Sequence, residues 1–136
     1  MILPVPISPN RWKSNPYAQQ AQKDEYRAHV WQAALLQGRP TRDPPELVHI
    51  TATFYLCKLR DEDNLSLKWT LDALRAKQQG AMRWRQGIAD KCAYFVDDSP
   101  DHMTMSKVQQ VKVPTRKEER LVLEITPLRW AREAEG

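Results

Sequence analysis

Residues 60–74 read RDEDNLSLKWTLDAL, and they join a hydrophobic, strand-like run to an amphipathic, helix-like run. Beyond residue 65 the apolar positions recur at helical spacing, at Leu67, Leu71 and Leu74. We expect either Asp63 or Asn64 to cap this helix, because a short polar side chain accepts hydrogen bonds from free N–H groups of the first turn. The chain is therefore expected to pass from strand to helix within a few acidic residues.

Four aspartates form two separated pairs around this junction. Asp61 and Asp63 stand two residues apart at the end of the strand, and Asp97 and Asp98 lie further along the chain. Mg²⁺ binds oxygen ligands and keeps several waters, so two or three carboxylates are enough to hold it. We expect Asp61, Asp63 and Asp98 to bind Mg²⁺, with Asp97 as an additional or supporting ligand. In the alternative reading these acids only cap a helix and a turn.

Composition limits the class of protein. The 136 residues suit one domain, and the net charge of +4 with a pI near 9.2 makes nucleic acid or another polyanion a plausible partner. Cys57 and Cys92 lack CxxC spacing and a neighbouring His, which favours buried free thiols in a reducing compartment. No apolar run is long enough for a membrane, and no Walker or GxGxxG motif indicates a nucleotide cofactor. We expect a cytoplasmic protein.

The order of the periodic segments predicts an α+β domain with a mixed sheet of four or five strands and two main helices. A helix is expected over about Tyr17–Gln37, and a central strand with one buried face over Leu47–Lys58. Met1–Pro6 is expected at a sheet edge or start, because its prolines donate no hydrogen bonds. Met105–Val113 and Arg120–Thr126 are expected to form a hairpin, with the mixed-charge residues 114–119 at its exposed tip.

Basic residues are expected to contact DNA at three places. Arg60 precedes the acidic pair, and Arg11 and Lys13 flank Trp12 in a polar loop that suits a DNA backbone and an unstacked base. An equally open reading folds Trp12 onto the core. The third place is the basic stretch 75–91, whose candidate contacts are Arg75, Lys77, Arg83, Trp84, Arg85 and Lys91. Its simpler reading is a solvated charged face.

The motifs together resemble the RusA family of Holliday junction resolvases. The resemblance is carried by Asp-x-Asp-Asn-Leu from Asp61, by Lys68, by Asp-Ala-Leu from Asp72, by Val-Asp-Asp ending at Asp98, and by the proline-rich segment 4–10. It implies one RusA-like endonuclease domain over 1–136, with 75–91 as a basic insertion and 128–136 as a tail.

This resemblance also implies an activity. It predicts a homodimeric, Mg²⁺-dependent endodeoxyribonuclease, bacterial or phage-encoded, that resolves four-way junctions by paired nicks in DNA recombination and repair. Asp61, Asp63 and Asp98 match the acids of the family pattern, and Lys68 matches the lysine that would stabilise charge at the scissile phosphate.

Lys68 departs from the family pattern in its spacing. It lies five residues after Asp63 rather than four, which on one continuous helix changes its direction by about 100°. A bulge or a later helix start is needed to aim it, and its alternative is a solvent-facing lysine paired with Asp72. Two other functions therefore stay open: a non-cleaving junction- or DNA-binding module of the same fold, and a Mg²⁺-dependent hydrolase of nucleotides.

Overall fold

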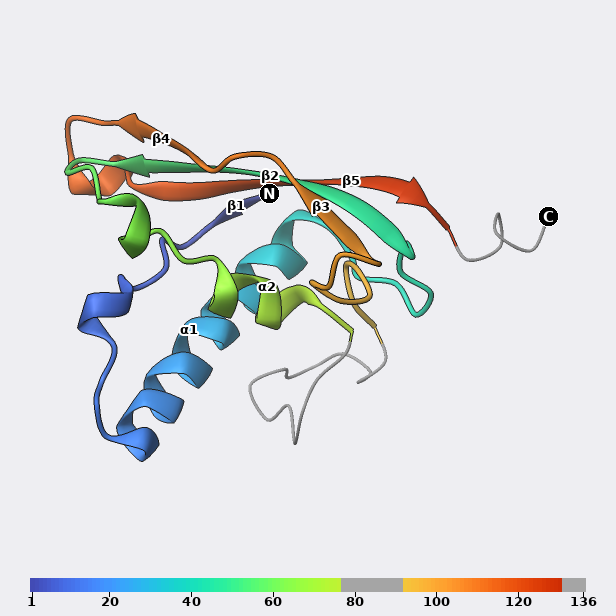
Figure 1. The fold of residues 1–136 in the computed structure, drawn as a ribbon, viewed down its shortest axis with the longest axis horizontal. Helices are drawn as coiled ribbons and strands as arrows, with labels where there is room; N and C mark the ends of the chain where they lie inside the picture. Colours follow the sequence, from blue (N-terminus) through green and yellow to red (C-terminus); the bar gives the residue numbers. More distant parts are fainter. Residues whose placement is uncertain (77–91, 131–136) are drawn as a thin grey trace.

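A ten-residue strand, β2 (Leu47–Leu56), lies at the centre of a five-stranded mixed sheet in the computed structural model, which describes residues 1–76 and 92–130. β5 (Arg120–Arg129) pairs with β2 in the antiparallel direction, and the short β1 (Ile2–Leu3) forms the edge beyond β5. On its other side β2 pairs in parallel with β3 (Met103–Met105) and β4 (Gln109–Lys112). The predicted α+β fold with a mixed sheet is confirmed (Figure 1).

The predicted hairpin over residues 105–126 is wrong. β4 and β5 do not pair with each other but lie on opposite sides of β2. The turn between them holds a short 3₁₀ helix, η3 (Arg116–Glu118), which contacts β2. The first predicted strand is also divided, because β3 pairs with Val48–Ile50 and β4 pairs with Thr53–Leu56. β2 is long enough to take two short partners in succession along one edge.

Helix α1 (Pro16–Gln37) matches its predicted limits. Asn15 caps it, because its Oδ1 accepts from the backbone N–H groups of Tyr17 at 2.9 Å and Ala18 at 3.2 Å. Pro16 is tolerated in the first turn, where its missing N–H needs no partner. The buried residues of α1 are Tyr26, Arg27, Val30, Trp31 and Ala34.

Helix α2 (Lys68–Leu74) begins later than predicted. Neither Asp63 nor Asn64 caps it, because both belong to a separate 3₁₀ turn, η2 (Glu62–Asn64), and the residue at the cap position is Leu67. Backbone bonds from Asn64 N–H to the Asp61 carbonyl and from Leu65 N–H to the Glu62 carbonyl close this turn, at 2.9 and 3.1 Å. The predicted apolar positions 67, 71 and 74 are buried, so the helical face was right although the start was not.

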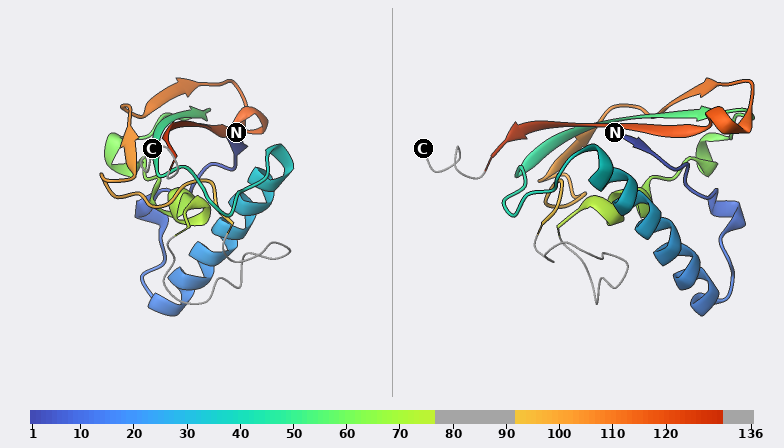
Figure 2. Two further views of the ribbon diagram at one scale, coloured as in Figure 1. Left: turned by 90° about the vertical axis from the view of Figure 1, so that its right-hand side faces the viewer. Right: turned by 180° about the vertical axis from the view of Figure 1, so that it is seen from behind.

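The core lies between one face of the sheet and the two helices (Figures 1 and 2). β2 contributes every second residue to it, at Val48, Ile50, Ala52, Phe54 and Leu56. Full burial of one large apolar side chain contributes about 1.5–3 kcal/mol, so this face fixes the register of the strand. Within 1–76 and 92–130, no helix has both the length and the apolar character to cross a membrane.

Trp12 packs against the protein, which supports the reading in which its side chain folds onto the core. Its ring stacks on Trp69 of α2, with centroids 4.6 Å apart and planes 11° from parallel. Its Nε1 donates to the Ile7 carbonyl at 3.3 Å. This stack ties the loop after η1 (Pro9–Arg11) to the helix that follows the acidic pair.

The two cysteines differ from the prediction. Cys57 and Cys92, predicted to be buried, are both partly exposed.

Candidate functional site

Asp61 and Asp63 stand at the end of the central strand, as predicted, and both side chains are exposed. The backbone just before them is fixed from β4. The Arg60 N–H donates to Gln110 Oε1 at 2.9 Å, and Gln110 Nε2 donates back to the Arg60 carbonyl at 2.8 Å. η1 contacts η2 on the other side, so the acidic turn is held between the N-terminal loop and the sheet.

A groove with a volume of about 700 Å³ opens beside this acidic turn. We call it the strand-end groove. It lies between the N-terminal segment, the end of β2 and the η3 turn. Its charged lining residues are Arg11, Lys58, Arg60, Asp61, Arg116 and Glu119. Four cations therefore face two carboxylates, which makes the groove a favourable place for an anion.

Arg60 is the most enclosed cation of this groove. Its Nη1 donates to the Pro6 carbonyl at 2.8 Å, which holds the guanidinium against the N-terminal segment. Burial lowers the pKa of Arg60, the nearby charge of Arg11 lowers it further, and Glu119 opposes the shift. A charge with reduced solvation interacts more strongly with an incoming anion than an exposed one does. Arg60 is thus placed to hold an anion that enters from the solvent.

Glu119 is the groove's internal counter-charge. Its Oε2 accepts from the Cys57 backbone N–H at 2.9 Å, and this bond is the main reason that the pKa of Glu119 lies below its ordinary value. The positive charges of Arg116 and Arg60 lower the pKa further. Glu119 is therefore ionised at neutral pH and offsets part of the charge of these arginines.

The second aspartate pair lies in a different setting, around Arg75. The Arg75 guanidinium contacts Asp72 Oδ1 at 2.9 Å, Asp97 Oδ1 at 3.3 Å and Asp98 Oδ1 at 2.9 Å. Lys23 of α1 adds a second cation, 3.3 Å from Asp72 Oδ2. We call these five residues the Arg75 cluster. Arg75, predicted to contact DNA, is here engaged with carboxylates of the protein itself.

The two aspartate pairs are associated with opposite ends of α2. The segment that leads to Asp97 runs beside the end of this helix, with Tyr94 N–H donating to the Leu74 carbonyl at 3.0 Å and Ala76 N–H to the Phe95 carbonyl at 2.9 Å. Asp61 and Asp63 precede the other end. Seven helical residues span about 10 Å, which separates the two ends of α2 that the pairs adjoin.

This separation bears on the predicted Mg²⁺ site. The donor chemistry fits, because all four side chains offer carboxylate oxygens. The placement does not: in the described parts of the chain, no three His, Cys, Asp or Glu side chains are gathered so that they would hold a metal ion. The convergence of Asp61, Asp63 and Asp98 on one ion stays a prediction. It requires Asp98 to give up its ion pair with Arg75 and to bind the metal ion instead.

Lys68 is exposed and is the first residue of α2. Asp63 belongs to the separate η2 turn, and the non-helical residues 65–67 lie between this turn and Lys68, so the five-residue spacing does not fall on one helix. The helix thus starts later than predicted, which is one of the two arrangements that would aim Lys68, and its direction toward the acidic turn stays a prediction. Lys68 faces the solvent, as its alternative reading expects, but Asp72 forms ion pairs in the described part of the chain with Lys23 and Arg75 and not with Lys68.

The remaining predicted DNA contacts divide into two groups. Arg11 and Lys13 are exposed at the N-terminal loop. The residues Lys77, Arg83, Trp84, Arg85 and Lys91 lie outside the described residues. Sequence reasoning missed Arg116 and Lys58 as groove residues. The sequence pattern places Arg116 at the exposed tip of a hairpin. In the structure β4 and β5 pair with opposite sides of β2, and the turn between them reaches the groove.

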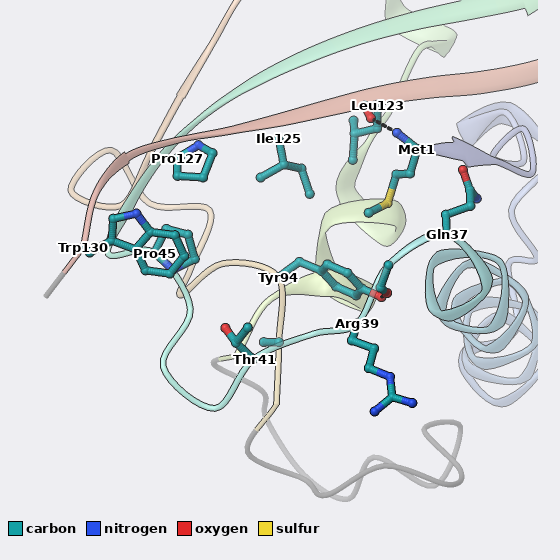
Figure 3. A pocket seen from close by; sticks show the side chains of 12 residues that line it. Met1, Gln37, Arg39, Thr41, Pro45, Tyr94, Leu123, Ile125, Pro127 and Trp130 are labelled. Carbon is teal, nitrogen blue, oxygen red and sulfur yellow. Dashed lines mark hydrogen bonds between the residues drawn. The ribbon is translucent and has the colours of Figure 1, made fainter.

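A second hollow, with a volume of about 550 Å³, lies toward the other end of β2 (Figure 3). Apolar side chains from β5 and the α1–β2 connection dominate its lining, with Ile125, Pro127, Trp130 and Pro45 among them. Arg39 is its one charged side chain among the described residues, and no acid accompanies it. Its chemistry does not match that of the predicted site.

Comparison with known proteins gives no relative. No protein-family model, no curated protein and no solved structure matches this chain.

Proposed function

We propose that this protein is a Mg²⁺-dependent, structure-selective endodeoxyribonuclease that resolves four-way DNA junctions by paired nicks. The observation that supports the proposal most strongly is that Asp61 lines the same groove as Arg11 and Arg60. A polyanion held by these arginines would lie next to the acidic turn. Such acids would repel a phosphodiester unless they also bind a cation.

Each residue has a distinct part in this proposal. Arg60 and Arg11 would hold backbone phosphates. Asp61 and Asp63 would hold the ion, with Asp98 as the third ligand once it leaves its ion pair with Arg75, and with Asp97 in support. When bound, Mg²⁺ neutralises phosphate charge and lowers the pKa of a coordinated water. Lys68, exposed at the start of α2, is assigned to charge stabilisation at the scissile phosphate.

Two nicks on opposed strands require two equivalent sites. A homodimer with one two-fold axis provides them, because a single interface places both copies of the acidic turn symmetrically. Sedimentation or light scattering at micromolar concentration tests this part, with a dimer mass expected. A monomer that retains junction cleavage at that concentration would contradict it.

The test of activity uses Asp61→Asn, Asp63→Asn and Asp98→Asn on a four-way junction with Mg²⁺. We expect cleavage to fall by at least about a hundredfold in each, the scale for losing a group that stabilises transition-state charge. Junction binding by gel shift should stay the same or tighten, because a negative charge near phosphate is removed.

Glu62→Gln is the matched control. Glu62 stands between the two aspartates in the same turn, is exposed, and is not assigned to the ion. Its variant should cleave normally. Loss of folding by circular dichroism in all three Asn variants, or equal loss of activity in Glu62→Gln, would return these acids to a structural role.

A non-cleaving junction-binding module is the second candidate, and the ion pair between Asp98 and Arg75 favours it. That contact uses the acid which the nuclease proposal needs as a ligand. Tight junction binding without cleavage, with Mg²⁺ and in the wild-type protein, would decide for this candidate.

A further inference from the structure

We propose that the strand-end groove binds the backbone of one nucleic-acid strand, and that Arg116 is a phosphate contact together with Arg60 and Arg11. This inference rests on the proposed function for the identity of the ligand as DNA. It adds a residue from the β4–β5 turn that neither the motifs nor the acidic turn indicate. It also gives the strand a path that leads to Asp61.

Arg116 is presented by an ordered turn. Thr115 and Glu118 form a capping box around η3, one bond of which runs from the Thr115 backbone N–H to Glu118 Oε2 at 3.3 Å. A backbone bond from the Glu118 N–H to the Thr115 carbonyl, at 3.2 Å, closes the same turn. The backbone is thereby fixed while the Arg116 side chain stays exposed and lines the groove. Lys117, the next residue, is also exposed but does not line it.

Three guanidinium groups reach this groove from distant parts of the chain. Arg11 comes from η1, Arg60 from the end of β2 and Arg116 from η3. Their mutual repulsion destabilises the empty groove, and Glu119 and Asp61 offset only part of it. A guanidinium donates two parallel hydrogen bonds to a phosphate, so successive phosphates are the natural partners of such a set.

A strand of nucleic acid fits this groove better than a lone anion does. The lining runs from the N-terminal loop across the end of β2 to the η3 turn, so its cations do not belong to one element. A single phosphate accepts from one or two arginines, whereas a strand presents a charge at every nucleotide. Asp61 closes the lining with the carboxylate that the nuclease proposal assigns to chemistry.

Arg116→Gln and Lys117→Gln form a matched pair for the test, because both remove one positive charge from exposed positions in the same turn. The probe is a single-stranded oligothymidylate of about 12 nucleotides, within the usual site sizes for single-strand binding, followed by fluorescence anisotropy in EDTA over a salt series. At about 0.1 M salt we expect binding to Arg116→Gln to be about fivefold weaker, with the log–log salt slope reduced by about 0.7. Lys117→Gln should change binding less than twofold, and Arg116→Lys should restore most of the loss.

Equal effects in Arg116→Gln and Lys117→Gln would overturn the proposal, because they would show only a response to net charge. The proposal would also be overturned if inorganic phosphate displaced the oligonucleotide at an equal concentration of phosphate groups, because this result would indicate a site for a lone anion. Thermal unfolding of both variants should match the wild type. Since binding is measured in EDTA, absent cleavage with Mg²⁺ would overturn the nuclease proposal alone, whereas an unaffected Arg116→Gln would overturn this inference alone.

Discussion

The Arg75 cluster and the strand-end groove use the same residue types in opposite ways. In the cluster, three carboxylates surround one guanidinium, and Lys23 covers the remaining oxygen of Asp72, whose side chain is only 5% exposed. In the groove, four cations face two carboxylates at the surface. The cluster thus pairs both of its cations with carboxylates of the protein, whereas the groove leaves a surplus of cations for a ligand. The comparison shows that the positions of opposite charges, rather than the net charge of +4, indicate where a polyanion would bind.

Arg75→Gln should have the largest effect, which is on the free energy of unfolding, because it removes the central cation of the Arg75 cluster. It leaves Asp72, Asp97 and Asp98 without their shared cation, and we expect the free energy of unfolding to fall by about 3 kcal/mol. Urea unfolding measures it, and millimolar Mg²⁺ should stabilise this variant more than the wild type, because the carboxylates are then available to a cation. Lys68→Gln, an exposed cation at the other end of α2, is the control, with a change within about 0.5 kcal/mol. Equal values for the two variants would show that the cluster contributes no stability.

Asp98→Asn and Asp63→Asn should separate stability from activity. Asp98→Asn loses one contact to Arg75 and should cost about 1 kcal/mol, because its side chain is one-third exposed. Asp63→Asn should change the free energy of unfolding by less than about 0.5 kcal/mol. Both should nevertheless abolish cleavage under the proposed function. If cleavage instead falls in proportion to the free energy of unfolding, strongly in Asp98→Asn and little in Asp63→Asn, impaired folding would explain the loss of activity in both variants.

The smallest expected effect is on the pH dependence of stability, and it comes from Glu119. Its pKa lies below the ordinary 4.5 in the folded protein, mainly because it accepts the Cys57 N–H. The resulting stabilisation is present above the unfolded-state pKa and is lost as the pH falls through the folded-state value. The urea midpoint of the wild type should therefore fall more between about pH 6 and about pH 3 than that of Glu119→Gln. Parallel pH profiles would show that this bond does not couple folding to protonation.

The sequence predicts those parts of the fold that depend on local patterns. The α1 limits follow from Asn15, Pro16 and an apolar stripe, and the buried face of β2 follows from strict alternation. In each case the deciding interactions lie within a few residues of each other, so no knowledge of distant contacts is needed.

The errors have a local cause and a distant cause. The local one is the η2 turn, which delays α2 because backbone bonds within residues 61–65 replace the predicted side-chain cap. Distant segments decide where Asp97 and Asp98 lie: the bonds from Tyr94 and Ala76 align their segment with the far end of α2, and their convergence with Asp61 on one ion stays a prediction. Arg116 was hidden by the wrong hairpin. None of these pairings leaves a periodic signal in the sequence, because each depends on which edge or helix end a segment meets.

The topology of β2 has a consequence for how this chain folds. All of its sheet partners lie at residue 103 or later, and β1 at residues 2–3 pairs with residues 121–122 of β5. Pairing over such separations closes long loops, which slows folding relative to helical proteins of the same size. During synthesis, residues 47–56 leave the ribosome with both strand edges unpaired until the last quarter of the chain appears. Folding of this sheet is therefore a late event, and its central strand, with two unpaired edges, is exposed to aggregation in the meantime.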